Sequence, residues 1–240
     1  MTRIWDYSIE TVHSVASVAE ILRFYRRRKA PGVRRIGKAE VTKLVEARTF
    51  FVAREGKHGR IAGTVYFSAQ GLKRSRSEFE MGGGLMAARH RRTGLVKCLG
   101  VCGLVAFRMS VQRSPTDPGT DVTIVGRVEQ SNPSPVRRVL RGLGFRSVGV
   151  RRINPRSKRG LDRMPIGPDG RIVVSQYRFN ETKLLDRIRE AGAYRDSGVL
   201  GGSGKTVHVA IRELTVQDPL QDFLHGLRDQ VARSHRANGR

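Results

Sequence analysis

The chain has 240 residues, and its 46 Lys and Arg against 21 Asp and Glu give a formal net charge of +25. This excess excludes an acidic, solvating protein and disfavours a neutral metabolic enzyme. The hydrophobic fraction of 38% is sufficient for the core of one α/β domain. No apolar run reaches the roughly 20 residues of a membrane span, and the first residues contain no apolar signal segment. We therefore expect a soluble, cytoplasmic protein.

Hydrophobic periodicity and turn residues predict alternating helices and strands. In chain order they are a helix over 9–29, a helix over 38–47, strands over 49–54, 60–67 and 79–86, a helix over 95–109, a strand over 122–128, a helix ending at 143, and strands over 145–150 and 171–179. The two strands before residue 70 form a hairpin. Gly82 to Gly84 interrupt the strand over 79–86, which indicates a bulge or the close approach of another backbone or a ligand.

The order of these elements predicts a mixed α/β sheet flanked by helices. We assign residues 1–180 to one domain and residues 181–240 to a C-terminal extension packed on it. The extension is predicted to contain a helix near 181–191, a strand near 206–213 and a helix near 220–234.

Two short segments carry a resemblance to a known family. The first is LMAARHRRTGLV, residues 85–96, which joins a strand to an apolar helix. The second is Asn132 followed by VRRVLRGLGF, residues 136–145. With the order of elements, they resemble the GNAT superfamily of acyl-CoA-dependent N-acyltransferases over roughly residues 10–150. The resemblance implies a mostly antiparallel central sheet with helices on both faces.

The first segment is similar to the family's pyrophosphate loop, Gln/Arg-x-x-Gly-x-Gly/Ala, with Arg91 and Gly94 at matching positions. A helix that begins there presents unpaired N–H groups and its positive dipole end to an anion. The resemblance implies acetyl-CoA, or another acyl-CoA, as co-substrate. The residues that it implies for binding are the backbone of Leu85, Met86 and Ala87, the loop residues Arg91, Arg92, Thr93, Gly94, Leu95 and Val96, and Asn132.

The sequence departs from the family pattern at two positions. Val96 stands where the family prefers Gly or Ala, and Leu140 stands where many members have a Tyr general acid. Glu78 and Glu80 lie on the strand where members often keep a general base, which deprotonates an amine directly or through a water. Alternatively, both are solvated carboxylates that balance the basic turn before them.

We expect transfer of an acyl group, acetyl first, to an amine whose identity the sequence leaves open. Basic clusters over 23–38 and 137–159 suggest contact with nucleic acid, tRNA or DNA, so candidate acceptors are aminoacyl-tRNA, a ribosomal protein or a nucleobase. Alternatively, a GC-rich genome gives the same arginine excess without any functional demand. If the two basic clusters bind nucleic acid, they should converge near the acceptor cleft.

The second hypothesis is a GNAT-fold nucleic-acid-binding protein that is non-catalytic or modifies a base, as the similarly basic phage proteins of the Mom type do.

Two other motifs predict no chemistry. Cys98 and Cys102 share a helix face, but no pair of ligands elsewhere completes a zinc site, so we expect no metal. The run over 201–206 departs from P-loop spacing and is interpreted as a turn.

Overall fold

The computed structural model describes residues 5–27, 34, 36–56, 59–73, 76–91, 95–112, 121–130, 132, 136–157, 164–180, 183 and 207–210. Its strands are β1 Trp5–Thr11, β2 Phe50–Glu55, β3 Ile61–Lys73, β4 Arg76–Met86, β5 Asp121–Glu129, β6 Phe145–Ile153, β7 Ile172–Phe179 and β8 Val207–Ala210. Its helices are α1 Val18–Arg26, α2 Lys38–Glu46, α3 Leu95–Gln112 and α4 Val136–Gly142, with 3₁₀ turns η1 Val15–Ser17, η2 Ala88–His90 and η3 Pro155–Ser157.

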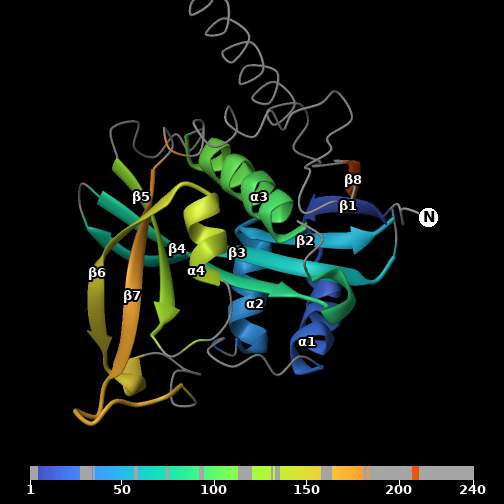
Figure 1. The fold of residues 1–240 in the computed structure, drawn as a ribbon. Helices are drawn as coiled ribbons and strands as arrows, with labels where there is room; N and C mark the ends of the chain where they lie inside the picture. Colours follow the sequence, from blue (N-terminus) through green and yellow to red (C-terminus); the bar gives the residue numbers. More distant parts are fainter. Residues whose placement is uncertain are drawn as a thin grey trace, which may run out of the picture.

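The described strands form one sheet in the order β6-β7-β5-β4-β3-β2-β1-β8 (Figure 1). The pairs β4–β5 and β1–β8 are parallel, and the others are antiparallel. The mixed, mostly antiparallel sheet expected from the sequence is therefore confirmed. β8 belongs to the C-terminal extension and pairs with β1, from Trp5–Val207 to Ser8–Ala210.

The boundary between residues 180 and 181 remains a prediction. Apart from Lys183, the helix expected near 181–191 lies outside the described residues, as does the helix expected over 220–234.

The helix predicted over 9–29 is wrong at its start, because β1 occupies its first residues. Tyr7, Ile9 and Thr11 are buried at the period-two spacing of a strand. Ser14 then caps η1 by accepting the Ala16 N–H at 3.2 Å, and α1 begins only at Val18. Local spacing could not show this, because β1 exists through its distant partners β2 and β8. The second predicted helix, the hairpin and the apolar helix are confirmed as α2, β2–β3 and α3.

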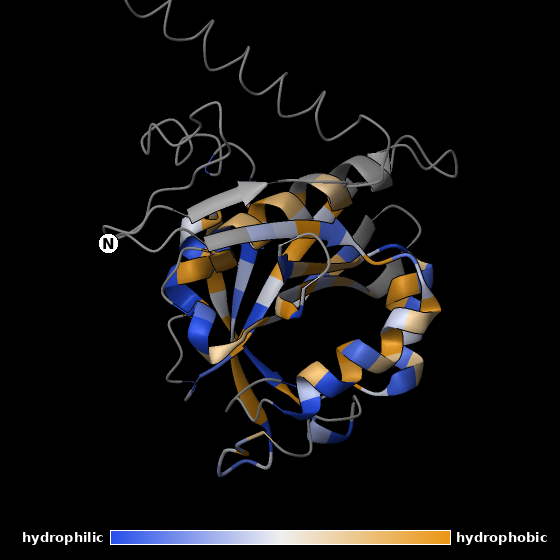
Figure 2. Cartoon of the chain, turned by 90° about the vertical axis from the view of Figure 1, so that its right-hand side faces the viewer, coloured by the Kyte–Doolittle hydropathy of each residue, from blue (hydrophilic) through white to orange (hydrophobic). Residues whose placement is uncertain are grey.

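Two cores lie on opposite faces of the sheet, between two helical layers (Figures 1 and 2). On one face α1 and α2 bury Ile21, Phe24 and Val41 against β2 and β3. On the other face α3 and α4 cover the larger core, where Phe67 and Phe107 stack with ring centroids 4.5 Å apart. Two glycines bring α3 close to its neighbours. A Cβ on Gly100 would lie 2.6 Å from a Leu143 methyl, and one on Gly103 would lie 3.1 Å from a Val65 methyl.

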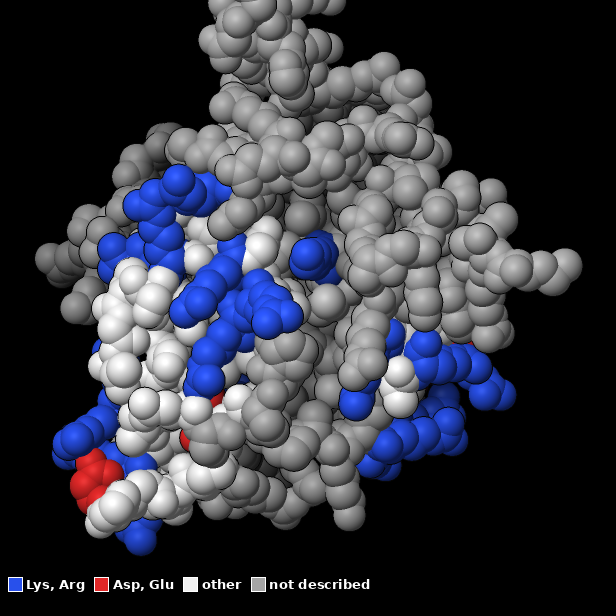
Figure 3. All heavy atoms as spheres, in the orientation of Figure 1, with Lys and Arg blue, Asp and Glu red and all other residues white. Residues whose placement is uncertain are grey.

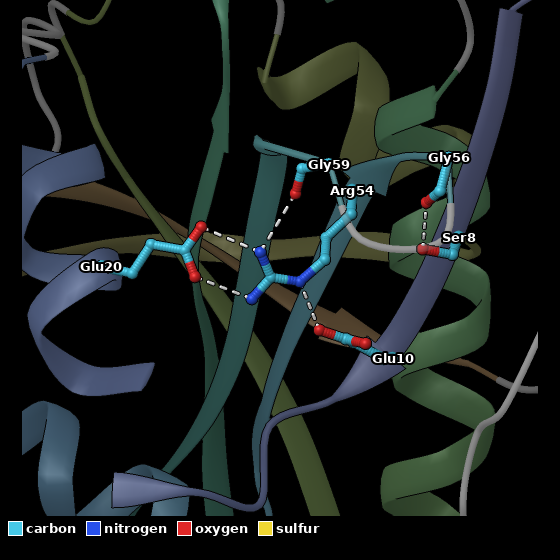
Figure 4. A network of polar contacts seen from close by, with 6 residues as sticks. All are labelled: Ser8, Glu10, Glu20, Arg54, Gly56 and Gly59. Carbon is cyan, nitrogen blue, oxygen red and sulfur yellow. Dashed lines mark hydrogen bonds and ion pairs between the residues drawn. The ribbon is translucent and has the colours of Figure 1, made fainter. Parts of the chain in front are cut away.

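One arginine ties β1, β2 and α1 together (Figure 4). Arg54 donates from Nε to Glu10 at 2.5 Å and from its two terminal nitrogens to Glu20 at 2.8 Å each. A further bond reaches the Gly59 carbonyl at 3.2 Å. The hydrogen bonds that Arg54 donates to Glu20 and Glu10 outweigh burial and raise the pKa of Arg54, so the charge is permanent. This network anchors α1 to the sheet.

The glycine run in β4 forms the predicted bulge. Thr64 pairs with Leu85 but Tyr66 pairs with Gly82, which leaves one extra residue on β4. Gly83 has φ +64°, and a Cβ there would lie 2.4 Å from both the Tyr25 hydroxyl and the Tyr66 ring. Its carbonyl accepts the Thr64 hydroxyl at 2.8 Å. The bulge therefore makes room for Tyr66 and Tyr25.

We predict that Gly83→Ala lowers the free energy of unfolding by about 2 kcal/mol or more, since the substitution adds both a clash and backbone strain. Gly84→Ala is the matched control, because a Cβ at Gly84 meets nothing within 4 Å. Denaturant unfolding measures both. Equal losses in the two variants would contradict this account of the bulge.

Candidate functional site

The central feature is the divergence of β4 and β5. They pair in parallel from Arg76–Asp121 to Glu80–Val125, and the pairing stops there. β4 stays with β3 as far as Met86, whereas β5 pairs with β7 on its other side as far as Glu129. The two strands therefore separate (Figure 1). Within the described part of the chain, no strand pairs with the β4 edge over residues 81–86.

This edge presents main-chain groups more than side chains. Leu85, Met86 and Ala87, predicted as backbone ligands, are all buried. The Ala87 N–H donates to the Ala62 carbonyl at 2.8 Å, so it is committed to β3. Because successive N–H groups of a strand point to opposite edges, the Met86 N–H faces the diverging side. Of the three predicted residues, Met86 therefore has the N–H best placed for a ligand.

The pyrophosphate loop expected after β4 is described only in part. Arg92, Thr93 and Gly94 lie outside the described residues. Arg91 is exposed, whereas Leu95 is fully buried and Val96 packs against the larger core. Leu95 is the first residue of α3, as predicted, so an apolar helix begins directly after the loop.

A buried histidine fixes the turn that leads into this loop. The His90 side chain is fully buried; its Nδ1 lies 2.7 Å from the Tyr7 hydroxyl and its Nε2 lies 2.5 Å from Glu55. Arg89 Nε also donates to His90 Nε2 at 3.1 Å, so both ring nitrogens of His90 have polar partners. Arg89 also pairs with Glu55. η2 is thus bonded to both β1 and β2, which sets where the loop begins.

Glu78 and Glu80 lie on one face of β4 and share one partner. Arg127 on β5 donates to Glu78 at 2.5 Å and to Glu80 at 2.9 Å. Its side chain is only 10% exposed. The three groups form a charged cluster at the last β4–β5 pairs. Sequence analysis missed Arg127, although a lone arginine within the apolar run VTIVGRVE was an available signal.

Tyr66 and Arg34 extend this cluster toward α2. The Tyr66 ring lies against Gly82 and Gly83, and its hydroxyl is 3.5 Å from an Arg34 nitrogen. Burial raises the pKa of Tyr66 to about 12; the Arg34 charge opposes this rise, and the Glu80 charge adds to it. Tyr66 is therefore a neutral phenol beside the carboxylates. Arg34 itself is held by two bonds to Glu40.

The second family segment lies close to β5. Asn132 is buried, and its N–H donates to the Glu129 carbonyl at 3.1 Å, just past the end of β5. Leu140 is also buried and packs on Gly126, where a Cβ would lie 3.0 Å from a leucine methyl. Leu140 is therefore a core residue, and this position supplies no hydroxyl.

The two basic clusters do not converge in the part of the chain that the structure describes. Arg23, Arg26 and Arg27 are exposed at the end of α1, while Arg34 turns inward to Glu40. The second cluster lies over α4 and β6, and α4 packs on the opposite face of the sheet from α1. Figure 3 shows Lys and Arg gathered at these two separate places. The described residues therefore do not form one basic surface.

The two cysteines of α3 are free thiols, and both are buried. Burial raises the pKa of the Cys98 thiol to about 12, and it also raises the pKa of the Cys102 thiol. Among the described residues, no group of three or more His, Cys, Asp or Glu is arranged to hold a metal ion. None of the described helices is long and apolar enough to cross a membrane.

Comparison with known proteins identifies the fold. No family model and no curated protein matches the sequence. A chain of the NatC complex, solved with Gag peptide and CoA, superposes with a TM-score of 0.52 at 12% identity, covering 72% of this chain and 98% of that one. YncA from Salmonella typhimurium, solved with its cofactor acetyl-CoA, superposes with a TM-score of 0.50 at 16% identity, covering 72% and 93%. The chain has the GNAT fold. The fold expected from the resemblance is therefore confirmed.

The His90 anchor makes a prediction about pH. Burial alone would raise the pKa of Glu55, but hydrogen bonds from His90 and Arg89 outweigh it and lower the pKa below 4.5. A carboxylate with a lowered folded-state pKa stabilises the fold above its unfolded pKa, and this stabilisation is lost as pH falls through the folded value. The stability deficit of Glu55→Gln should therefore be largest at neutral pH and shrink below about pH 4.

Denaturant unfolding at a series of pH values measures this deficit. Glu46→Gln, at an exposed position on α2, is the control. A deficit that stays constant down to pH 3 would show that Glu55 does not act through its charge.

Proposed function

We propose that the protein is an acyl-CoA-dependent N-acyltransferase, which moves an acyl group, acetyl first, from acyl-CoA to an amine. The observation that carries the proposal is the divergence of β4 and β5 after Glu80–Val125. It leaves a strand edge whose main-chain groups can pair with an extended ligand, and the chain after this edge leads through η2 and a loop to the N-terminus of α3. The GNAT fold and the CoA and acetyl-CoA in the two solved neighbours support this proposal.

The binding roles follow the chain. Of the predicted backbone ligands Leu85, Met86 and Ala87, Met86 would pair with the amide groups of the pantetheine arm as a neighbouring strand does, since the Ala87 N–H is bonded to Ala62. Asn132 would lie beside the same arm. The start of α3 would receive the pyrophosphate through main-chain N–H groups and the positive end of the helix dipole. The loop residues assigned to this role are Arg91, Arg92, Thr93, Gly94, Leu95 and Val96.

Glu80 is the proposed general base, with Glu78 beside it. An acceptor amine must lose a proton before it attacks the thioester, and a carboxylate takes that proton directly or through a water. Arg127 holds both carboxylates at fixed positions. Because the Arg127 guanidinium already donates to both carboxylates, we favour transfer of the proton through a water.

The acyl transfer itself also needs a hydrogen-bond donor that stabilises the oxyanion. The amine nitrogen bonds to the thioester carbon, the carbon–sulfur bond breaks, and CoA leaves as a thiolate. A main-chain N–H on the open edge of β4 would stabilise the oxyanion. Leu140 supplies no proton, so water protonates the thiolate.

The proposed acceptor is an amine linked to nucleic acid: aminoacyl-tRNA, a ribosomal protein or a nucleobase. The net charge of +25 supports a polyanionic partner, although the described basic clusters do not converge on one surface as this hypothesis expected. A second candidate is a nucleic-acid-binding protein that has lost catalysis or modifies a base. Two observations favour it: Arg127 pairs with both carboxylates, and Leu140 replaces the usual phenol.

The first test is acetyl-CoA binding by calorimetry at moderate salt. The wild-type protein should bind saturably, and both Arg91→Glu and Gly94→Asp should weaken binding by at least about tenfold, because each adds a negative charge where the pyrophosphate would lie. Arg156→Glu carries the same charge change on η3 as Arg91→Glu and should bind as the wild type does. No binding by the folded protein at millimolar acetyl-CoA would refute the proposal.

The second test concerns the base. With a panel of aminoacyl-tRNA, N-terminal ribosomal-protein peptides and oligonucleotides, release of the CoA thiol identifies the acceptor. Glu80→Gln should then lower kcat by about 10²-fold or more while the Kd for acetyl-CoA is unchanged. Glu78→Gln shares the Arg127 contact and is the matched comparison.

An equal, small effect in both glutamine variants would assign the carboxylates a structural role. Acetyl-CoA binding without thiol release, together with tight nucleic-acid binding, would favour the second candidate.

A further inference from the structure

The strand β6 has features that neither the fold nor the proposed reaction explains. It stands at one end of the sheet, and among the described strands it pairs only with β7 (Figure 1). Residues 146–152 are exposed throughout, although a strand of a packed domain normally buries one face. Val148 is 47% exposed and Val150 is 61% exposed.

The surroundings of β6 are strongly basic. The exposed arginines on β6 and β7, and on the turns beside them, are Arg146, Arg151, Arg152, Arg156, Arg171 and Arg178. Among the described residues, the acidic partner of these arginines is Asp169, which lies 3.3 Å from Arg152. Figure 3 shows several separate blue groups among white side chains on this side of the molecule, with little red.

A bulge near the start of β6 leaves a regular segment beyond it. The register with β7 shifts between Ser147 and Gly149 and then runs without interruption from Gly149–Gln176 to Ile153–Ile172. The outer N–H and C=O groups of this segment can continue the sheet with another extended chain. Val150 and Arg152 share one face of the segment, and Arg151 occupies the other.

We propose that the outer edge of β6, over residues 149–153, binds an extended acidic peptide segment by adding it as a further strand. In the bound peptide, the residue opposite Val150 is apolar, and the residues opposite Arg151 and Arg152 carry carboxylates. Main-chain hydrogen bonds supply the pairing, and carboxylate–guanidinium pairs supply the selectivity.

Two other occupants fit this edge less well. A second copy of the chain would place Arg146, Arg151 and Arg152 against the same arginines, and like charges across strands are destabilising. Nucleic acid would satisfy the charge but not the strand edge or the valines. Residues 146–152 also contain no aromatic side chain on which a base could stack.

The test uses a blocked, fluorescently labelled peptide that contains consecutive Glu, Glu and Val between threonines. The full-length protein should bind it, and Arg151→Glu and Arg152→Glu should each weaken binding by about tenfold. Arg60→Glu is the matched control, because Arg60 is exposed before β3, away from β6 in the strand order, and its loss should change the Kd less than about twofold.

Two further probes separate strand addition from simple charge attraction. A peptide N-methylated at alternate residues keeps its charge but cannot complete the ladder, and it should bind about tenfold more weakly. Amide hydrogen exchange over residues 147–153 should slow in the complex. An unchanged midpoint of thermal unfolding shows that the variants are folded.

Four outcomes would overturn the proposal. They are no binding of the peptide, equal binding of the N-methylated peptide, tighter binding of oligothymidylate with the same charge, and a dimer through β6 in the free protein. The third would assign the edge to nucleic acid, and the fourth would assign it to a second copy of the chain.

Discussion

Main-chain polar groups need hydrogen-bond partners, and this requirement governs what the divergence of β4 and β5 can do. β5 finds partners in β7, and β4 finds partners on one side in β3. The other edge of β4 beyond Glu80 depends on water or on a ligand. An extended molecule with amide groups satisfies such an edge as a strand would. This constraint connects the geometry of the sheet to the proposed binding of acyl-CoA.

The rest of the molecule keeps the two strands apart and in place. The larger core packs β4 and β5 on one face of the sheet, and the core under α1 and α2 packs the end of β4 on the other, so β4 cannot move toward β5 without losing packing. Tyr66 fills the space that the glycine bulge opens in β4. Arg127 joins the strands at their last pairs, and His90 bonds the following turn to β1 and β2. The open edge is therefore built into a rigid frame.

Local sequence pattern predicted those parts of the fold that depend on near neighbours. The α2 and α3 helices, the β2–β3 hairpin and the glycine bulge each have a signal within a few residues. β1 was missed because its pairing with β2 and β8 is non-local, and apolar spacing beyond it resembled a helix. Likewise, Glu78 and Glu80 were visible in the sequence, but their shared partner Arg127 depends on strand register. Periodicity gives no information about register.

The most direct test of the central claim is amide hydrogen exchange of the protein with and without acetyl-CoA. If the open edge of β4 binds the pantetheine arm, exchange should slow over residues 81–87 and at the start of α3. The paired strand β2 and the distant β6 should not change. Saturable binding of acetyl-CoA without protection in β4 would contradict the account, because the ligand would then lie elsewhere on the fold.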